Sequence, residues 1–313
     1  MKNHYSRFEF LTEEIKNSIN PFLRKMFPFS TTKLLAKITT EELDNLFYKL
    51  LKPSKIDYLI ECGAHEASAS MNFIKQGGKS IAIEANPFVF KNITPKSFEN
   101  FTSINVALSN KKGRLNFYFP KNNNRSGQST FLPKKGIEYD KIEVNTVELD
   151  ELLKEKSIEN QNICFWIDVE GLQKEVLEGS LFYLKNNCRF IKIEVESKEI
   201  FSKQKWLSKD VDEFLEKNDF LPVFRDFEFD TQFNVLYVKK AHLKELKSII
   251  KQSKTDIQKK INIQKIIFLL FNKQNFIQEA KQFFINSFGS KIGNSISAAF
   301  GSKSSKDFLK YNK

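Results

Sequence analysis

Residues 53–240 show the pattern that is typical of a doubly wound α/β domain built on a mostly parallel sheet. Short apolar runs alternate with segments in which apolar residues recur at helical spacing, which is the signature of βαβ units. Acidic residues stand where several runs end, and ligands bind at the carboxyl ends of strands in such sheets. Two extended segments follow the fifth run, so the sequence predicts a seven-stranded sheet that ends in an antiparallel pair.

The individual elements follow from the same pattern. Five parallel strands are expected at residues 56–62, 79–85, 102–108, 162–169 and 189–196, with helices at 67–76, 87–92, 148–156, 171–186 and 208–217. The antiparallel pair is expected at 220–226 and 233–240. Residues 114–147 interrupt the alternation, and we interpret them as an inserted strand pair whose Asn, Ser and Gly-rich loop could face a substrate.

Helical segments flank this domain on both sides. Residues 1–52 are expected to form helices that serve as a lid or packing element, with Thr39 or Thr40 as a helix cap ahead of Glu41 and Glu42. Residues 241–313 are expected to form a Lys-rich helical extension. We favour packing of this extension on the domain or on a second subunit, with peripheral contact to an anionic membrane or another partner as alternatives.

Charge and cysteine usage narrow the class of function. Residues 241–313 carry 14 lysines, no arginine and four acidic residues, so +10 of the net charge of +12 belongs to the extension. The near-neutral remainder favours a small-molecule enzyme over a nucleic-acid-binding protein. Cys62, Cys164 and Cys188 form no CxxC pair, and no apolar window suits a signal peptide or a membrane span, so we expect a cytoplasmic location.

A glycine turn marks the first candidate site. The segment IECGAHEAS at residues 60–68 places an acidic residue at the end of a strand, Gly63 at the turn and a helix start directly after it. Glycine lets a backbone approach a ligand closely, and a helix N-terminus offers free N–H groups to the carboxylate or ribose of a nucleoside ligand. A generic strand-to-helix turn gives the same pattern.

Two further strand ends complete the outline of a nucleoside site. Glu84 ends the next strand 21 positions after Gly63, and acidic residues at about this spacing accept hydrogen bonds from ribose hydroxyls. Ala107, at the end of the third strand, is small enough to leave room for a flat base. The structural alternatives are a solvent-exposed Glu84 and an ordinary buried strand end.

The most specific feature is the segment FWIDVEGLQKEVLEG at residues 165–179. Its apolar strand delivers Asp168 and Glu170 to the carboxyl end, and Gly171 permits the turn into a helix. Two carboxylates at this place can act as a general base for a hydroxyl, hold a divalent cation, or anchor a cationic group of a cofactor. In the structural alternative, Asp168 or Glu170 caps the helix.

In their order and spacing these motifs resemble those of FkbM-type methyltransferases. The matching blocks are Glu61-Cys62-Gly63-Ala64, Glu84-Ala85-Asn86-Pro87, Asn105-Val106-Ala107-Leu108, Val147-Glu148-Leu149-Asp150, Ile167-Asp168-Val169-Glu170-Gly171 with Glu175-Val176-Leu177, and Ile193-Glu194-Val195. The resemblance leaves both flanking segments unmatched. It implies a sheet of the class I methyltransferase type, S-adenosylmethionine as the cofactor, and methyl transfer to an oxygen atom of a sugar, a glycan or a related small metabolite.

The same resemblance implies roles for individual residues. It places cofactor contacts at Glu61, Cys62, Gly63, Ala64, His65, Glu84, Ala85, Asn105, Ala107 and Asp168, catalytic carboxylates at Asp168 and Glu170, and substrate contacts at Arg125, Ser129 and Glu194. Asp168 and Glu170 could also hold a divalent metal. The first block departs from the family, which usually has Asp, Asn and Gly where this chain has Glu61, His65 and Ala67, and the methyl group of Ala67 is expected to lie where the contact with the cofactor is tight.

Other functions stay open at this point. The basic extension could serve a nucleic-acid methyltransferase, although the near-neutral core and the lack of arginine in the extension weigh against it. A non-catalytic scaffold with the same fold and a membrane-associated protein are further alternatives. The sequence also permits a homo-oligomer.

Overall fold

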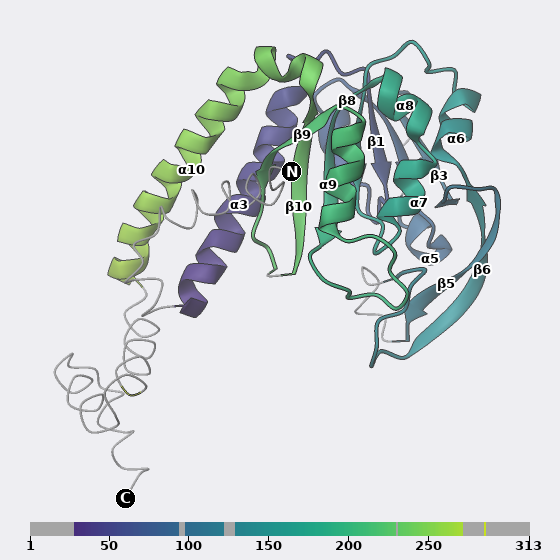
Figure 1. The fold of residues 1–313 in the computed structure, drawn as a ribbon, viewed down its shortest axis with the longest axis horizontal. Coiled ribbons are helices and arrows are strands. Elements are labelled where there is room, and N and C mark those ends of the chain that lie inside the picture. Colours follow the sequence, from purple (N-terminus) through teal and green to yellow (C-terminus); the bar gives the residue numbers. More distant parts are fainter. Residues whose placement is uncertain (1–27, 94–97, 122–128, 230, 272–284, 286–313) are drawn as a thin grey trace, which may run out of the picture. The chain divides into compact units, whose positions relative to one another are not determined.

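A seven-stranded sheet forms the centre of the computed structural model, which describes residues 28–93, 98–121, 129–229, 231–271 and 285. The strand order is β3-β2-β1-β7-β8-β10-β9 (Figure 1). The strands are β1 (Tyr58–Cys62), β2 (Lys79–Ile83), β3 (Phe101–Ile104), β7 (Ile163–Ile167), β8 (Cys188–Glu196), β9 (Phe220–Arg225) and β10 (Gln232–Lys239). All neighbours pair in parallel except β10, which is antiparallel to β8 and β9. The predicted seven-stranded sheet of the class I methyltransferase type is therefore confirmed.

Six short helices connect the strands of this sheet. They are α4 (Ser68–Ile74), α5 (Pro87–Phe90), α6 (Leu149–Glu155), α7 (Gln173–Glu178), α8 (Leu181–Asn186) and α9 (Ser208–Lys217). The central strands are buried on both faces, as expected for parallel strands that lie between two layers of helices. All three cysteines are buried and free.

The register of the central strands brings three loop starts together. Cys62 at the end of β1 lies opposite Ile83 of β2 on one side and Ile167 of β7 on the other. The residues that follow these strands therefore emerge side by side. The chain order reverses at this point, and such a switch point is where ligands bind in open α/β sheets.

The inserted segment forms the predicted pair of strands. These strands belong to a second sheet, which also contains β4 (Ala107–Leu108), a strand from the region that was predicted as the third strand of the main sheet. Strands β5 (Gly113–Pro120) and β6 (Tyr139–Val147) pair with each other, and β4 pairs with β6. The prediction of one strand over 102–108 is wrong. Asn105 interrupts it, because its amide group donates to the carbonyl oxygens of Glu84 and Ala85, at 2.7 and 3.3 Å, and the chain then turns to the second sheet.

The helix predicted over residues 171–186 is also wrong as a single element. It breaks at Gly179 into α7 and α8. A Cβ atom at Gly179 would lie 2.2 Å from the carbonyl oxygen of Ser109, so the backbone approaches another segment too closely for a side chain. Asp150 then holds the new helix start, since its carboxylate accepts from the backbone N–H groups of Phe182 and Tyr183 at 2.7 and 3.1 Å.

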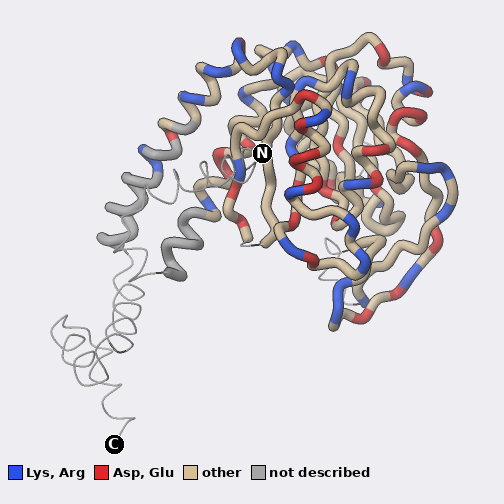
Figure 2. The backbone as a smooth tube through the Cα atoms, viewed as in Figure 1, with Lys and Arg blue, Asp and Glu red and all other residues tan. Residues whose placement is uncertain are grey.

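Long helices flank the two sheets in the sequence. Helix α3 (Pro28–Leu51) runs through Thr39 and Thr40 without a break, so the predicted cap there is wrong, and the Thr39 hydroxyl donates within the helix to the carbonyl oxygen of Ala36. A short 3₁₀ helix η2 (Lys240–His242) precedes α10 (Leu243–Phe271). Lysines recur along the described part of α10 (Figure 2). None of the described helices is long and apolar enough to cross a membrane.

The contacts divide the chain into two units. Residues 43–251 form the unit that contains both sheets, and residues 1–42 with 252–313 belong to the other. Inside the first unit, the ring of Phe47 packs edge-on against Trp166 and Phe190, and Lys192 reaches Asp44 at 2.5 Å. Inside the second unit, Lys260 pairs with Glu42.

Candidate active site

A cavity of about 310 Å³ opens at the carboxyl ends of β1, β2 and β7. It is lined by Gly63, His65, Ile83, Glu84, Ala85, Val89, Val106, Leu108, Phe117, Ser129, Thr130, Phe131, Asp168, Val169, Glu170 and Leu172. The strand ends of the main sheet supply its charged residues, while the inserted segment supplies an aromatic and hydroxylated wall. This combination of apolar walls and a few polar groups is typical of a small-molecule site.

The turn after β1 requires glycine for two reasons. Gly63 has a φ of +77°, which side chains rarely adopt. A Cβ atom there would lie 1.7 Å from the carbonyl oxygen of Asp168, so the turns after β1 and β7 touch at this residue. The Gly63 N–H donates to the carbonyl oxygen of Ile83 at 2.9 Å, and the Asp168 N–H donates to that of Cys62, also at 2.9 Å. These contacts fix the floor of the cavity.

Glu61 holds a helix in place. Its carboxylate accepts from the backbone N–H groups of Ala69 and Ser70, at 3.1 and 2.8 Å, in the first turn of α4. Burial raises the pKa of Glu61 to about 7, against the lowering effect of these hydrogen bonds. The expectation that the N-terminus of this helix offers free N–H groups to a ligand is therefore wrong for these two groups, because the protein itself occupies them.

His65 and Ala67 both adopt left-handed backbone conformations, with φ of +47° and +57°, but they face different surroundings. His65 lines the cavity. Ala67 is fully buried in an apolar cluster with Ala64, Ala82 and Ile93. Its methyl group therefore packs into the core, and the expected contact between this methyl group and a cofactor does not follow from the geometry.

Glu84 is the buried carboxylate at the end of β2. One of its oxygen atoms accepts from the backbone N–H of His65, and the other accepts from that of Asn86, both at 2.7 Å. Burial raises the pKa of Glu84 above its ordinary value of 4.5. The two hydrogen bonds hold the carboxylate rigidly against the cavity, and each oxygen keeps a lone pair for a further donor.

Asp168 and Glu170 occupy the turn after β7. Glu170 has a φ of +46° and Gly171 a φ of +100°, so the backbone is in a left-handed conformation at two consecutive residues. The Thr130 hydroxyl donates to the Glu170 carbonyl oxygen at 2.7 Å, and the Lys134 ammonium group lies 3.3 Å from the Glu170 carboxylate. Helix α7 starts only at Gln173, without a side-chain cap, so neither carboxylate caps it.

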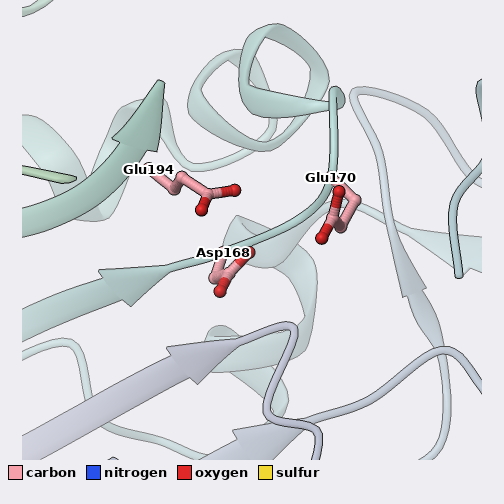
Figure 3. A group of neighbouring side chains, drawn as sticks. All are labelled: Asp168, Glu170 and Glu194. Carbon is pink, nitrogen blue, oxygen red and sulfur yellow. The ribbon is translucent and has the colours of Figure 1, made fainter. Parts of the chain in front are cut away.

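Glu194 from β8 joins these two residues in a cluster of three carboxylates (Figure 3). One oxygen atom from each of Asp168, Glu170 and Glu194 lies within 4.8 Å of the others. Burial raises the pKa of Asp168, raises that of Glu170 to about 7 with a further contribution from Asp168, and raises that of Glu194 well above its usual range. Gln232 donates to Glu194 at 2.7 Å.

The structure thus brings together part of the predicted site. Gly63, His65, Glu84, Ala85, Ser129, Asp168 and Glu170 line the cavity. Glu194 lies against Asp168 and Glu170. Among the described residues, Glu61, Cys62, Ala64 and Ala107 stand outside the lining, in the strands and turns next to it. Asn105 is exposed and lines a neighbouring cavity of about 240 Å³, which shares Ala85 and Val106 with the first. Arg125 falls outside the described residues.

Sequence reasoning missed several residues of the inserted segment. Phe117, Thr130 and Phe131 line the cavity, and Lys134 pairs with Glu170. Thr130 and Phe131 end the polar loop at residues 122–131 that was expected near the substrate, while Phe117 and Lys134 lie elsewhere in the predicted insertion and carried no predicted role. Glu196 was also missed: it is buried on β8, and the side-chain amides of Gln173 and Gln204 donate to it at 3.1 and 2.6 Å.

Comparison with known protein families gives a match over the part of the chain that contains the cavity. A family model described as a methyltransferase FkbM domain matches residues 61–222. No curated protein sequence matches the chain.

Solved structures with a similar arrangement of elements include three methyltransferases. Magnesium protoporphyrin IX methyltransferase from Synechocystis PCC 6803, with bound S-adenosylmethionine, shares 10% identity over 71% of this chain and 85% of its own, with a TM-score of 0.35. A SAM-dependent methyltransferase from Aquifex aeolicus shares 12% identity over 72% and 96% of the two chains, with a TM-score of 0.32. The N-terminal domain of human METTL16 shares 14% identity over 64% and 68%, with a TM-score of 0.36.

Proposed function

This chain belongs to the FkbM family of S-adenosylmethionine-dependent methyltransferases, and we propose that it methylates a hydroxyl oxygen of a sugar, a glycan or a related small metabolite. The observation that carries the proposal is the position of Asp168. Its carboxylate lies in the cavity beside the Gly63 turn and within 4.8 Å of two further carboxylates. A hydroxyl acceptor needs such a base, because it must lose a proton as the oxygen atom gains the methyl group.

The residues around the cavity suit the cofactor. Glu84 presents a fixed carboxylate that matches the two hydroxyl groups of a ribose ring. Gly63 adds no side chain to the cavity wall, and Ala85 and Val106 add apolar surface near the second sheet. Bound S-adenosylmethionine supplies an electrophilic methyl group on a sulfonium with a good neutral leaving group.

Asp168, Glu170 and Glu194 have different proposed roles toward the acceptor. Asp168 is the proposed general base, since it lines the cavity beside the Gly63 turn and burial raises its pKa above the ordinary value of 3.8, which makes the carboxylate a stronger base. Glu170, which Lys134 already pairs, is proposed to orient the acceptor hydroxyl. Glu194 is proposed to lie next to the acceptor through its contact with Asp168. Most of the rate acceleration then comes from holding the acceptor in line with the methyl group.

Metal assistance is a second candidate because of one observation. Asp168, Glu170 and Glu194 can each offer one oxygen to a cation at a common point, and a divalent cation prefers such ligands. A cation there would lower the pKa of the acceptor hydroxyl and leave less proton transfer for Asp168. Addition of EDTA and then of Mg²⁺ or Mn²⁺ to an active preparation separates the two mechanisms.

The partners of the chain follow from the same charges. No described lysine or arginine lines the cavity to bind a phosphate backbone, so nucleic acid is the less suitable acceptor. Peripheral membrane contact through the Lys-rich extension, a homo-oligomer and a cytoplasmic location stay predictions from the sequence.

The proposed function is tested with labelled cofactor and a panel of acceptors. The panel contains free sugars, sugar nucleotides, glycans, RNA and DNA, and transfer is measured by acceptor-bound label. We expect label on a sugar or glycan and a loss of about 100-fold or more in kcat for Asp168→Asn, because general-base catalysis contributes about 10²–10⁴-fold. Asp140→Asn, which changes an exposed carboxylate on β6, serves as the matched control. Unchanged turnover of Asp168→Asn, or label on nucleic acid only, would contradict the proposal.

A further inference from the structure

A short segment of the insertion, Ser129–Lys134, connects two sides of the cavity. At one end, the amide group of Asn86 after β2 donates to the Ser129 hydroxyl at 3.1 Å. On the other side of the cavity, the Thr130 hydroxyl donates to the backbone carbonyl of Glu170 after β7, and the Lys134 ammonium group pairs with the Glu170 carboxylate. The backbone groups of Thr130 and Tyr118 exchange two hydrogen bonds of 2.8 Å, which anchor the segment to the second sheet.

Lys134 is held in a fixed place within this segment. Its side chain is 16% exposed, and the ammonium group lies 4.5 Å from the centre of the Phe201 ring. Phe201 is itself buried and packs on Gly171, where a Cβ atom would lie 2.9 Å from the ring. Lys134 therefore bridges the carboxylate of Glu170 and the aromatic ring that supports the following residue.

The turn that Lys134 contacts needs such support. A left-handed conformation at Glu170 is unfavourable for a residue with a side chain and persists only where the surroundings impose it. The carboxylates of Asp168 and Glu196 repel Glu170, and Lys134 is the cation that opposes them. Asp168 in turn touches Gly63, so a shift of this turn would reach the floor of the cofactor cavity.

We propose that Lys134 is a positioning residue: it acts through Glu170 to hold the 168–171 turn against Gly63, and thereby keeps the cofactor cavity in its binding shape. The inference rests on the proposed role of this turn in the site. It does not depend on the acceptor, because the turn forms one wall of the cavity whichever molecule is methylated.

The test is a double-mutant cycle on cofactor affinity. Dissociation constants of S-adenosylmethionine and S-adenosylhomocysteine are measured by calorimetry for Lys134→Met, Lys134→Arg, Glu170→Gln and the Lys134→Met/Glu170→Gln double variant. Lys135→Met, which changes the exposed neighbouring lysine, is the matched control. We expect Lys134→Met to weaken both ligands by about 10-fold, Lys134→Arg by less than about 3-fold, and Lys134→Met to change affinity by less than about 2-fold when Glu170 is already Gln.

Each other outcome identifies a different role. An equal loss in both backgrounds would mean that Lys134 acts by packing on Phe201 alone. Tighter binding of S-adenosylmethionine relative to S-adenosylhomocysteine would mean a simple charge effect on the sulfonium. Either result overturns the proposal. If Lys134→Met does not fold, Thr130→Val removes the neighbouring tie to Glu170 and is expected to weaken both ligands by about 3-fold or more. Failure of the acceptor panel would affect none of these measurements.

Discussion

Replacement of Gly63 by alanine tests the contact on which the whole site depends. Two effects add at this position. The φ of +77° is unfavourable for a residue with a Cβ atom, and the new methyl group would lie 1.7 Å from the carbonyl oxygen of Asp168. The second effect has no easy relief, because the neighbouring atom belongs to the backbone. The turns after β1 and β7 must therefore separate, and the floor of the cavity opens.

The expected loss of stability of Gly63→Ala is the sum of these two effects. The left-handed conformation costs about 1–2 kcal/mol for a non-glycine residue. Forcing an extra methyl group into a packed place typically costs about 1–3 kcal/mol more. We therefore expect Gly63→Ala to lower the free energy of unfolding by about 2–5 kcal/mol. Gly77 provides the matched control: its φ is +85°, but none of the described atoms would lie within 4 Å of its Cβ. Gly77→Ala should show only the conformational part, about 1–2 kcal/mol.

Urea unfolding and calorimetric titration measure the two consequences. Both variants are compared with the parent protein in urea, and each is titrated with S-adenosylmethionine in buffer. Gly63→Ala should be the less stable variant and should lose measurable cofactor binding, while Gly77→Ala should bind as the parent does. Equal destabilisation of the two variants, together with parental affinity in Gly63→Ala, would refute the reasoning.

Three further predictions concern the residues that support the site. Burial raises the pKa of Glu61 and Glu196 from 4.5 to about 7, so the folded state keeps protons that the unfolded chain has released, and stability should fall as the pH rises from 4.5 to about 7. Glu196→Gln should flatten this slope by up to about 1.4 kcal/mol per pH unit in urea unfolding, and an unchanged slope would contradict the assignment. Asp150→Ala removes the acceptor for the first N–H groups of α8 and should cost about 1–2 kcal/mol in thermal unfolding, whereas a neutral effect would exclude this role. Ala67→Gly relieves a left-handed conformation but loses a buried methyl group, so the net change in the free energy of unfolding should stay below about 1 kcal/mol. The control Ala69→Gly, inside α4, loses a buried methyl group without such relief and should lower the free energy of unfolding by about 2 kcal/mol.

The strands of the main sheet were predictable because their information is local. Apolar runs that end at acidic or glycine residues correctly predict β1, β2, β7 and β8. The order of the motifs along the chain correctly predicts the type of sheet that these strands form. The same argument fails where a distant segment decides the conformation. Nothing near Gly179 in the sequence shows that the carbonyl oxygen of Ser109 will lie against it, so the break between α7 and α8 could not be foreseen.

The candidate site shows the same division. Glu84 and Asp168 were predictable, because the carboxyl ends of neighbouring parallel strands meet at one edge of the sheet. Glu61 was assigned to the cofactor on its place in a motif, yet its carboxylate points to the start of α4. A motif specifies a residue type at a turn, and the direction of the side chain depends on the backbone conformation that follows.

The inserted segment supplies one wall of the cavity, which the main sheet does not form. The residues expected to handle the cofactor, Gly63 and Glu84, follow strands of the main sheet and depend on the register of those strands. The wall that faces them comes from the second sheet and its loop, with Phe117 and Phe131 in contact at 4.9 Å between ring centres. This wall can change without altering the register of the main sheet, because β5 and β6 pair with each other in the second sheet and with no described strand of the main sheet. Selectivity for the acceptor is therefore expected to reside in the insertion, and the chemistry of methyl transfer in the strand ends.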